Sequence, residues 1–218
     1  MMRKQNLIFL IVFGIFFGSV QHLVAQRSRV IINHIPKEKV TSSLNSLARK
    51  ITKNYHTETQ KSRAIFMWIA TNIGYDSDLR YDPKLQKEYF KSKDRLMTKA
   101  LQRKKTVCAG YAYLFQALCA EVGIEAAVID GYTKKTVPSS IVRNKVHHTW
   151  NAVKLNGTWE LLDITWATSY GSIKNPDAFW YRTRPQDFIY THYPQNVAWT
   201  LLKNPISFEL FEGILATN

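Results

Sequence analysis

The stretch TVCAGYAYLFQALCAEVG, residues 106–123, contains both cysteines of the chain, Cys108 and Cys119. Its apolar residues recur at helical intervals and Gly123 follows the last of them, which predicts one helix beginning near Cys108. Along a helix, at ~1.5 Å per residue, the two cysteines would lie roughly 16 Å apart. A disulfide requires Cα atoms within ~7 Å of each other. The pattern therefore predicts two free thiols.

The residues before this helix also follow a helical pattern. In TSSLNSLARKI, residues 41–51, the apolar residues fall on one helix face. The next stretch, TETQKSRAIFMWIATNIGYD, begins with Thr57 and Gln60 at the spacing of a capping box. The polar segment 77–89, which contains Pro83, predicts a loop.

Beyond Gly123 the apolar residues no longer recur at helical intervals but at every second position, the period of a strand. AAVIDGY, residues 126–132, predicts a strand, and residues 133–145 predict a loop whose role is open. VHHTWNAVKLNGTWELLDITW, residues 146–166, predicts a β-hairpin around Asn156 and Gly157. Helices followed by antiparallel strands indicate an α+β domain with a central Cys-bearing helix packed on the sheet.

The register of the hairpin follows from its Asn-Gly turn. If the strands extend to residue 166, Trp150 lies opposite Asp163, and His148 is a diagonal neighbour of Asp163. Side chains alternate between faces, so His148 and Asp163 share a face while His147 points to the other. Diagonal neighbours are ~7–8 Å apart at the backbone, which longer side chains can span. We therefore expect His148 and Asp163 to hydrogen-bond.

A histidine oriented by a carboxylate supplies two members of a catalytic triad. Cys108 begins its predicted helix directly after the basic segment RKKTV, and both the helix dipole and the cations would favour a thiolate there. Cys119, eleven residues further along, gains nothing from the helix end and is expected to be a small apolar core residue. Cys108 is therefore the candidate nucleophile, although such a trio of residues also occurs through ordinary packing.

The order of these motifs resembles the core of the transglutaminase-like superfamily over residues 104–167. That core has a cysteine opening a helix, a histidine in a strand as in HTWN (148–151), and an aspartate in a strand as in DITW (163–166). SRAIFMWIATNIGYD, residues 62–76, is similar to the helix that precedes this core. DFIYTHYPQNVAWTLLKNPIS, residues 187–207, is similar to the tail of the secreted bacterial and kyphoscoliosis-peptidase-like branch.

The resemblance implies a papain-like α+β fold in which Cys108 is the nucleophile, His148 the general base and acid, and Asp163 its orienting partner. It also implies attack on an amide or ester carbonyl and an acyl-enzyme that water or an amine resolves. The backbone N–H of Cys108 would supply one oxyanion donor. The second donor is not identified by the resemblance; Tyr75 is expected to be a packing residue, with the second donor as its alternative role.

Two tryptophans of the predicted hairpin and three aspartates complete the candidate residues. Trp150 and Trp166 either wall the site or pack the core. The aspartates of DSDLRYD, residues 76–82, lack the glycine turn and closing glutamate of a calcium loop. The sequence has neither HExxH nor CxxC, which disfavours a zinc enzyme. We expect no metal and no cofactor.

The first 25 residues resemble a secretory signal peptide. A basic start, MMRKQN, precedes the 14-residue apolar run LIFLIVFGIFFGSV and the small-residue exit QHLVA, so we expect cleavage after Ala25. A membrane anchor is the alternative, but a spanning helix needs ~20 apolar residues and His22 interrupts the run. The prediction is an exported protein, periplasmic or secreted and not membrane-spanning after cleavage. Residues 26–103 would form the basic helical part of the same domain as the core and tail, 104–218.

Positive charge is concentrated before the cysteine helix. Residues 26–105 carry 19 Lys and Arg against 7 Asp and Glu, whereas residues 106–218 carry 9 of each. This charge favours a solvated basic face, with an anionic envelope component as the alternative, a partner that an exported protein would meet. No nucleic-acid recognition motif accompanies the charge, so nucleic acid is not expected.

The sequence thus predicts an exported thiol enzyme acting on a protein or peptide, with hydrolysis favoured over crosslinking because water is the abundant acceptor outside the cell. A second hypothesis is a binding module that keeps the fold and holds a peptide or an anionic polymer without chemistry. Thiol reactivity separates the two, because a binding module needs no lowered pKa at Cys108.

Overall fold

The computed structural model describes residues 37–134 and 147–213. Residues from 37 onward belong to one compact unit. The predicted signal peptide and most of the predicted 133–145 loop lie outside the described residues. Within the described residues, no helix combines the length and the apolar character that crossing a bilayer requires.

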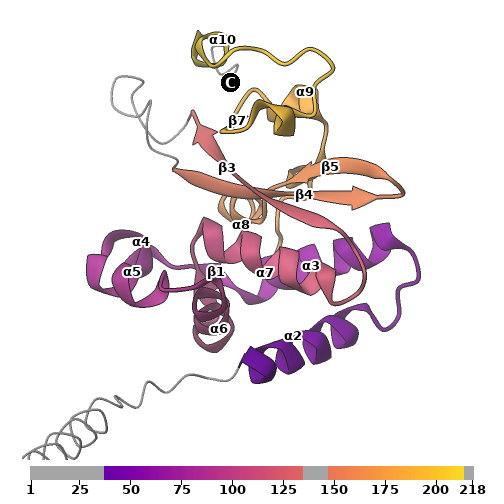
Figure 1. Cartoon of the computed structure of the whole chain (residues 1–218), viewed down its shortest axis with the longest axis vertical. Coiled ribbons are helices and arrows are strands. Elements are labelled where there is room, and N and C mark those ends of the chain that lie inside the picture. Colours follow the sequence, from indigo (N-terminus) through magenta and orange to yellow (C-terminus); the bar gives the residue numbers. More distant parts are fainter. Residues whose placement is uncertain (1–36, 135–146, 214–218) are drawn as a thin grey trace, which may run out of the picture. The chain divides into compact units, whose positions relative to one another are not determined.

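The first half of the described chain is helical and ends in the helix that carries both cysteines (Figure 1). Its elements are α2 (Lys37–Thr52), α3 (Glu58–Asn72), β1 (Gly74–Tyr75), α4 (Ser77–Tyr81), α5 (Pro83–Tyr89), α6 (Lys93–Arg103), β2 (Lys105–Thr106) and α7 (Cys108–Ala120). The predicted capping box of α3 is confirmed, with the Thr57 side chain accepting from the Gln60 backbone and the Gln60 side chain accepting from the Thr57 backbone. The apolar face of α2 is also confirmed, since Leu44 and Ala48 are buried in the core.

The prediction of a loop over residues 77–89 was wrong, because α4 and α5 occupy this segment. Both helices are short and are set by their caps rather than by an apolar stripe. The Asp76 carboxylate accepts from Leu79 N at 3.1 Å, and the Asp82 carboxylate accepts from Lys84 N at 2.7 Å. Pro83 occupies the first turn of α5, where a missing N–H costs nothing.

The second half supplies a five-stranded sheet in the order β6-β5-β4-β3-β7. Its strands are β3 (Ala126–Thr133), β4 (His148–Leu155), β5 (Thr158–Leu162), β6 (Tyr181–Thr183) and β7 (His192–Pro194). The predicted hairpin register is confirmed near its turn, where Leu155 pairs with Thr158. The turn residues Asn156 and Gly157 have φ of 49° and 83°, as a two-residue hairpin loop requires.

The predicted extension of the second hairpin strand to residue 166 was wrong. β5 ends at Leu162, and residues Ile164–Tyr170 form helix α8. Asp163 caps this helix, since its Oδ1 accepts from Trp166 N at 3.0 Å. All four residues from Ile164 to Ala167 are buried, a pattern that an alternating half-exposed strand cannot give. The strand pair between Trp150 and Asp163 therefore does not form.

Helix α7 packs along one face of the sheet, as predicted (Figure 1). Asn151 of β4 links the two layers, because its buried Nδ2 donates to Ala112 O at 3.1 Å and to Ala127 O at 2.9 Å. Cys119 lies in the core between these layers with 0% exposure. Burial there raises the pKa of its thiol. Both features agree with the small apolar core residue predicted from the sequence.

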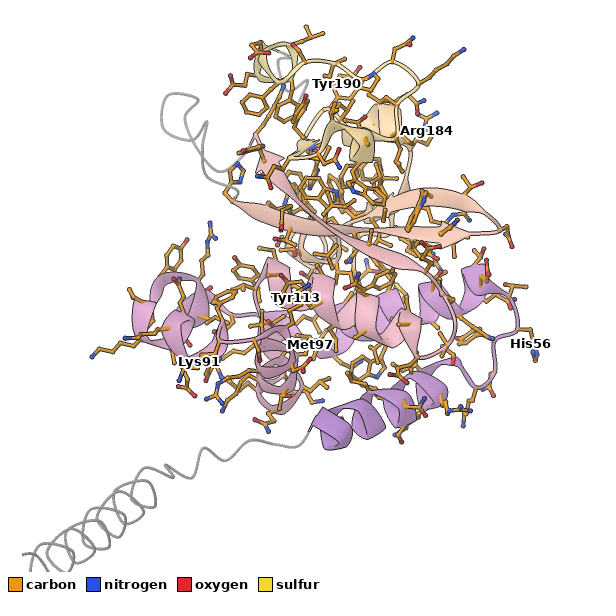
Figure 2. The ribbon with its side chains drawn as sticks, viewed as in Figure 1. His56, Lys91, Met97, Tyr113, Arg184 and Tyr190 are labelled. Carbon is orange, nitrogen blue, oxygen red and sulfur yellow. The ribbon has the colours of Figure 1, made fainter. Side chains whose placement is uncertain are left out.

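The C-terminal segment lies on the other side of the sheet from α7, as the labels Arg184 and Tyr190 against Met97 and Tyr113 show (Figure 2). It contains η1 (Ala178–Trp180), α9 (Pro185–Phe188), η2 (Val197–Thr200) and α10 (Phe208–Gly213). Strand β7 of this segment pairs antiparallel with the end of β3, with Thr133 opposite His192. The segment thereby reaches the end of β3 that lies beside the start of β4.

A methyl group at Gly131 should destabilise the protein. A Cβ there would lie 2.3 Å from Tyr193 O, 2.4 Å from Trp150 Cη2 and 2.9 Å from Pro194 Cα, and two of these atoms belong to backbone. We expect Gly131→Ala to lower the free energy of unfolding by about 1–3 kcal/mol, measured by urea denaturation. Gly213→Ala is the control, because a Cβ at Gly213 meets nothing within 4 Å. Equal midpoints for the two variants would contradict the close approach of β7.

Candidate active site

Cys108 is the first residue of α7, as the sequence predicts. The N-cap residue is Val107, whose apolar side chain makes no capping hydrogen bond. The first backbone N–H groups of the helix are therefore left without a side-chain acceptor. The backbone N–H of Ala109 instead helps to lower the pKa of the Cys108 thiol. This helix end favours negative charge on sulfur or on a nearby oxygen.

His148 and Asp163 are in direct contact, although Asp163 belongs to a helix cap rather than to a strand. His148 Nε2 lies 2.6 Å from Asp163 Oδ2, and the exposure of the two residues is 7% and 1%. Burial alone would raise the pKa of Asp163, but the His148 imidazolium holds it well below its usual range. Burial alone would lower the pKa of His148, but the Asp163 carboxylate raises it to about 10. The two groups therefore form an ion pair at neutral pH.

The Cys108 thiol interacts with the same imidazole. Burial opposes ionisation of Cys108, but the hydrogen bond and the charge of His148 outweigh it, and the pKa of the thiol is lowered. Because Nε2 of His148 is engaged by Asp163, Nδ1 is the ring nitrogen that remains for the sulfur. Cys108 is partly exposed to solvent, so a substrate can reach its sulfur. The three residues can therefore hold a thiolate–imidazolium pair.

Neighbouring His147 is engaged by the end of β3. Its Nε2 accepts from Thr133 N at 3.1 Å, and its ring packs against the ring of Tyr132. The expectation that His148, and not His147, meets Asp163 agrees with this geometry. His148 and Asp163 meet because β4 begins at His148, beyond the end of β5. There the first turn of α8 takes the place of the predicted strand.

His192 is a further residue of this site that sequence reasoning did not identify. Its Nε2 lies 3.0 Å from Asp163 Oδ2, the oxygen that also contacts His148. It arrives on β7, and no spacing within residues 104–167 points to it. The one clue in the sequence was the resemblance of residues 187–207 to the tail of a family branch. That resemblance assigned no function to any single residue of the stretch.

Aromatic side chains surround these imidazoles. The rings of Trp150 and Trp166 lie 6.0 Å and 6.1 Å from the ring of His148, and both tryptophans are buried. The two roles left open for them, walling the site and packing the core, therefore apply together. Tyr75 in β1 is 40% exposed, and burial together with the charge of Cys108 raises the pKa of its hydroxyl. The role of Tyr75 as a second oxyanion donor stays a prediction.

The aspartates of residues 76–82 are engaged by helix caps and by cations. Asp76 is buried and forms ion pairs with Arg103 and Lys105, while Asp78 Oδ2 lies 2.6 Å from Lys105 Nζ. Elsewhere His148, Asp163 and His192 place three potential ligand atoms within 4.8 Å of one another. The contacts of 2.6 Å and 3.0 Å at Asp163 are hydrogen-bond distances, which protons on the two imidazoles explain.

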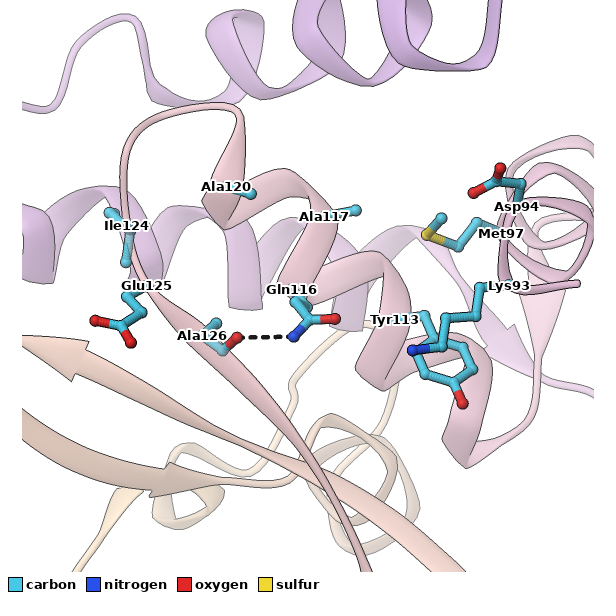
Figure 3. Close-up of a pocket in the computed structure, with 10 residues that line it drawn as sticks. All are labelled: Lys93, Asp94, Met97, Tyr113, Gln116, Ala117, Ala120, Ile124, Glu125 and Ala126. Carbon is cyan, nitrogen blue, oxygen red and sulfur yellow. Dashed lines mark hydrogen bonds between the residues drawn. The ribbon is translucent and has the colours of Figure 1, made fainter. Parts of the chain in front are cut away.

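A pocket of about 420 Å³ lies on another part of the surface, between α6, α7 and the start of β3 (Figure 3). Gln116 borders it and donates to Ala126 O at 2.9 Å. At one end, Lys93 Nζ lies 4.8 Å from the centre of the Tyr113 ring. None of Cys108, His148 and Asp163 lines this pocket.

Comparison with known proteins gives a family match over the centre of the chain. A sequence model described as Transglutaminase-like superfamily matches residues 45–164. Kyphoscoliosis peptidase of Mus musculus is 34% identical over 184 residues, which cover 80% of this chain and 26% of that protein. Hillarin of Drosophila melanogaster is 28% identical over 209 residues, which cover 85% of this chain and 24% of that protein. The chain thus spans about a quarter of the length of these relatives.

Two solved structures are also similar. A proposed cysteine protease from Cytophaga hutchinsonii has a TM-score of 0.43 and 24% identity, covering 57% of this chain and 37% of its own. The structure of a TGase has a TM-score of 0.44 and 18% identity, covering 69% of this chain and 38% of its own. The family match includes Cys108, His148 and Asp163 and extends over more than half of the sequence. The chain belongs to the transglutaminase-like superfamily.

Proposed function

We propose that this chain is a cysteine-dependent enzyme that acts on amide bonds through an acyl-enzyme on Cys108. The observation that carries the proposal is the contact of His148 with Asp163 at 2.6 Å, beside a thiol whose pKa the same imidazole lowers. A nucleophile, a base and an orienting carboxylate in this relation are the components of thiol acyl transfer. Membership of the family supports this reading.

In the first step the Cys108 thiolate attacks the carbonyl carbon of the substrate. The electron pair of the C=O bond moves to oxygen, and the backbone N–H of Cys108 at the start of α7 would donate to that oxyanion. Tyr75 would supply the second hydrogen bond, because its phenolic hydroxyl is a donor at neutral pH. His148 then gives its Nδ1 proton to the leaving amine, and a thioester on Cys108 results.

In the second step a nucleophile attacks the thioester and His148 accepts its proton; the C–S bond breaks and Cys108 leaves as the thiolate. Water gives hydrolysis, and an amine gives transamidation. We favour hydrolysis, because a protein exported from the cell meets water everywhere and needs no dedicated amine. Asp163 remains ionised throughout, since its pKa is held well below its usual range. It orients His148 through Nε2 and stabilises the imidazolium.

The alternative is a binding module that keeps the fold and holds a peptide or anionic polymer. It requires no activated thiol, so the lowered pKa of Cys108 favours the enzyme. Export, placement in the secreted bacterial branch and an anionic partner stay predictions. Lys84 and Lys87 of α5 and Lys91, between α5 and α6, are exposed, whereas Arg95 lies 2.6 Å from Glu88. The exposed lysines are the charges that an anionic partner would contact.

The experiment is acylation with p-nitrophenyl acetate, followed by mass spectrometry of the intact and digested protein. We expect a burst of p-nitrophenol and one acetyl group on the peptide that contains Cys108, with none on Cys119. Adding a dansylated amine then separates hydrolysis from transamidation, because only the latter forms a dansylated acetamide. No burst at any pH from 6 to 9, from folded protein, would refute the acyl-enzyme.

A further inference from the structure

We propose that His192 is a positioning residue of the active site, which donates a second hydrogen bond to Asp163 and so holds this carboxylate in place for His148. The inference rests on the proposed function and extends it to the C-terminal segment. His192 is 1% exposed and lies on β7, outside the residues 45–164 that the family model covers. The mechanism above leaves this buried imidazole without a role.

The hydrogen bonds around His192 define where its proton lies. Its Nε2 is 3.0 Å from Asp163 Oδ2, and an ionised carboxylate can only accept, so Nε2 carries hydrogen. Its Nδ1 is 2.8 Å from Thr191 Oγ1, which also lies 3.3 Å from Phe188 O. The single hydroxyl hydrogen goes to the nearer Nδ1 when that nitrogen is unprotonated. The arrangement is satisfied by the neutral Nε2–H tautomer. Asp163 Oδ2 then accepts from two imidazoles, and Oδ1 accepts from Trp166 N.

Neutrality is what lets a second histidine assist the first. The ring centres of His148 and His192 are 5.5 Å apart, so two imidazoliums would repel each other. Burial lowers the pKa of His192 to about 4. The charge of His148 also lowers this pKa, whereas the Asp163 carboxylate acts to raise it. His192 therefore contributes a hydrogen bond at neutral pH and leaves the positive charge on His148.

Packing fixes the His192 ring in this orientation. It stacks on Phe188 with ring centres 4.1 Å apart and planes inclined by 30°. The ring of Trp166 lies 4.3 Å away, and that of Trp150 lies 5.1 Å away. Pairing of His192 with Thr133 anchors its backbone to β3. A rigid donor of this kind adds a third hydrogen bond to the Asp163 carboxylate, beside those with His148 and Trp166 N.

The test compares His192→Phe with His192→Gln by the pH dependence of iodoacetamide alkylation at Cys108. Phenylalanine fills the ring space without a donor, and glutamine can restore a donor to Asp163. We expect His192→Phe to raise the apparent pKa of Cys108 by about one unit, which slows alkylation about tenfold at acid pH, and His192→Gln to recover most of the loss. Thr191→Val should act in the same direction with a smaller shift.

The matched control is His147→Phe, which removes a neighbouring imidazole whose Nε2 is engaged by Thr133 N. Its alkylation profile should coincide with that of the unaltered protein. A folded His192→Phe variant with an unchanged profile, differing only in melting temperature, would overturn the positioning role. If instead the unaltered protein shows an ordinary Cys108 pKa, the proposed function itself fails.

A second measurement needs no variant. Nitrogen-15 NMR of histidine-labelled full chain reports the tautomer of each ring. We expect one histidine that is neutral and protonated on Nε2 throughout pH 5.5–9, assigned as His192 by its disappearance in His192→Gln. A His192 that is protonated on Nδ1, or charged at pH 7, would overturn the proposal even if His192→Phe does not fold.

Discussion

Cys108→Ala is expected to abolish acylation and to reduce turnover of p-nitrophenyl acetate by about 10⁴-fold or more, to the level of free imidazole. Loss of the nucleophile from a triad removes the covalent pathway, and the remaining members cannot substitute for it. The fold should persist, because Cys108 is only partly buried at the start of α7. Burst amplitude, turnover and the acylated mass measure the effect together.

The same substitution at the second cysteine provides the control. Cys119→Ala removes a sulfur atom from the core, so it should lower the free energy of unfolding by ~1–2 kcal/mol. The burst should remain intact, because burial raises the pKa of the Cys119 thiol and keeps it protonated. A burst that survives Cys108→Ala but disappears in Cys119→Ala would reverse the assignment of the nucleophile.

Asp163→Asn should reduce the acylation rate by about 10³–10⁴-fold with the structure largely preserved. Asparagine keeps a carbonyl oxygen for the N-cap of α8, so the contact with Trp166 N can form. It lacks the negative charge that raises the pKa of His148 to about 10. Its amide group also presents N–H toward two imidazoles that donate. The His148 ring should lose both its charge and its orientation.

The control for this charge removal is Asp177→Asn. Asp177 also accepts a backbone hydrogen bond at an N-cap, from Phe179 N at 3.0 Å, but it belongs to η1 and contacts neither histidine. Its acylation rate should remain within about twofold of the unaltered protein. Equal losses for Asp163→Asn and Asp177→Asn would show that the effect is not specific to the charge that orients His148.

The buried carboxylate should also shape the pH dependence of stability. Because the folded pKa of Asp163 is lowered, its ionised form stabilises the fold above the unfolded value of ~3.9, and this contribution is lost as the pH falls below it. For His148 the folded pKa is raised, so its contribution is full below ~6.5 and is lost as the pH rises toward about 10. Urea midpoints of Asp163→Asn should lack both dependences, because the Asp163 carboxylate is also what raises the pKa of His148.

The sequence predicted the local features of this fold well where a short pattern determines them. The Asn156–Gly157 turn set the hairpin register, and Thr57 with Gln60 marked the start of α3. The burial of Cys119 followed from its position on α7. In each case residues close in sequence decide the structure, so no long-range contact was needed.

Features that depend on competition or on distant contacts were missed. Asp163 can end a strand or cap a helix, and only the burial of Ile164 through Ala167 decides for the helix. Its contact with His148 was nevertheless expected, because both arrangements place it near the start of β4. His192 was missed because its approach depends on β7 pairing with β3 across many residues. No local periodicity encodes that pairing.

The measurement that tests the central claim most directly is the pH dependence of iodoacetamide alkylation at Cys108 and Cys119, in the unaltered protein and in His148→Ala. We predict that Cys108 reacts with an apparent pKa well below the ~8.5 of a free thiol and that His148→Ala returns it to an ordinary value. Cys119 should stay unreactive in both proteins. A Cys108 that titrates like a free thiol in both proteins would contradict the thiolate–imidazolium pair and favour the binding module instead.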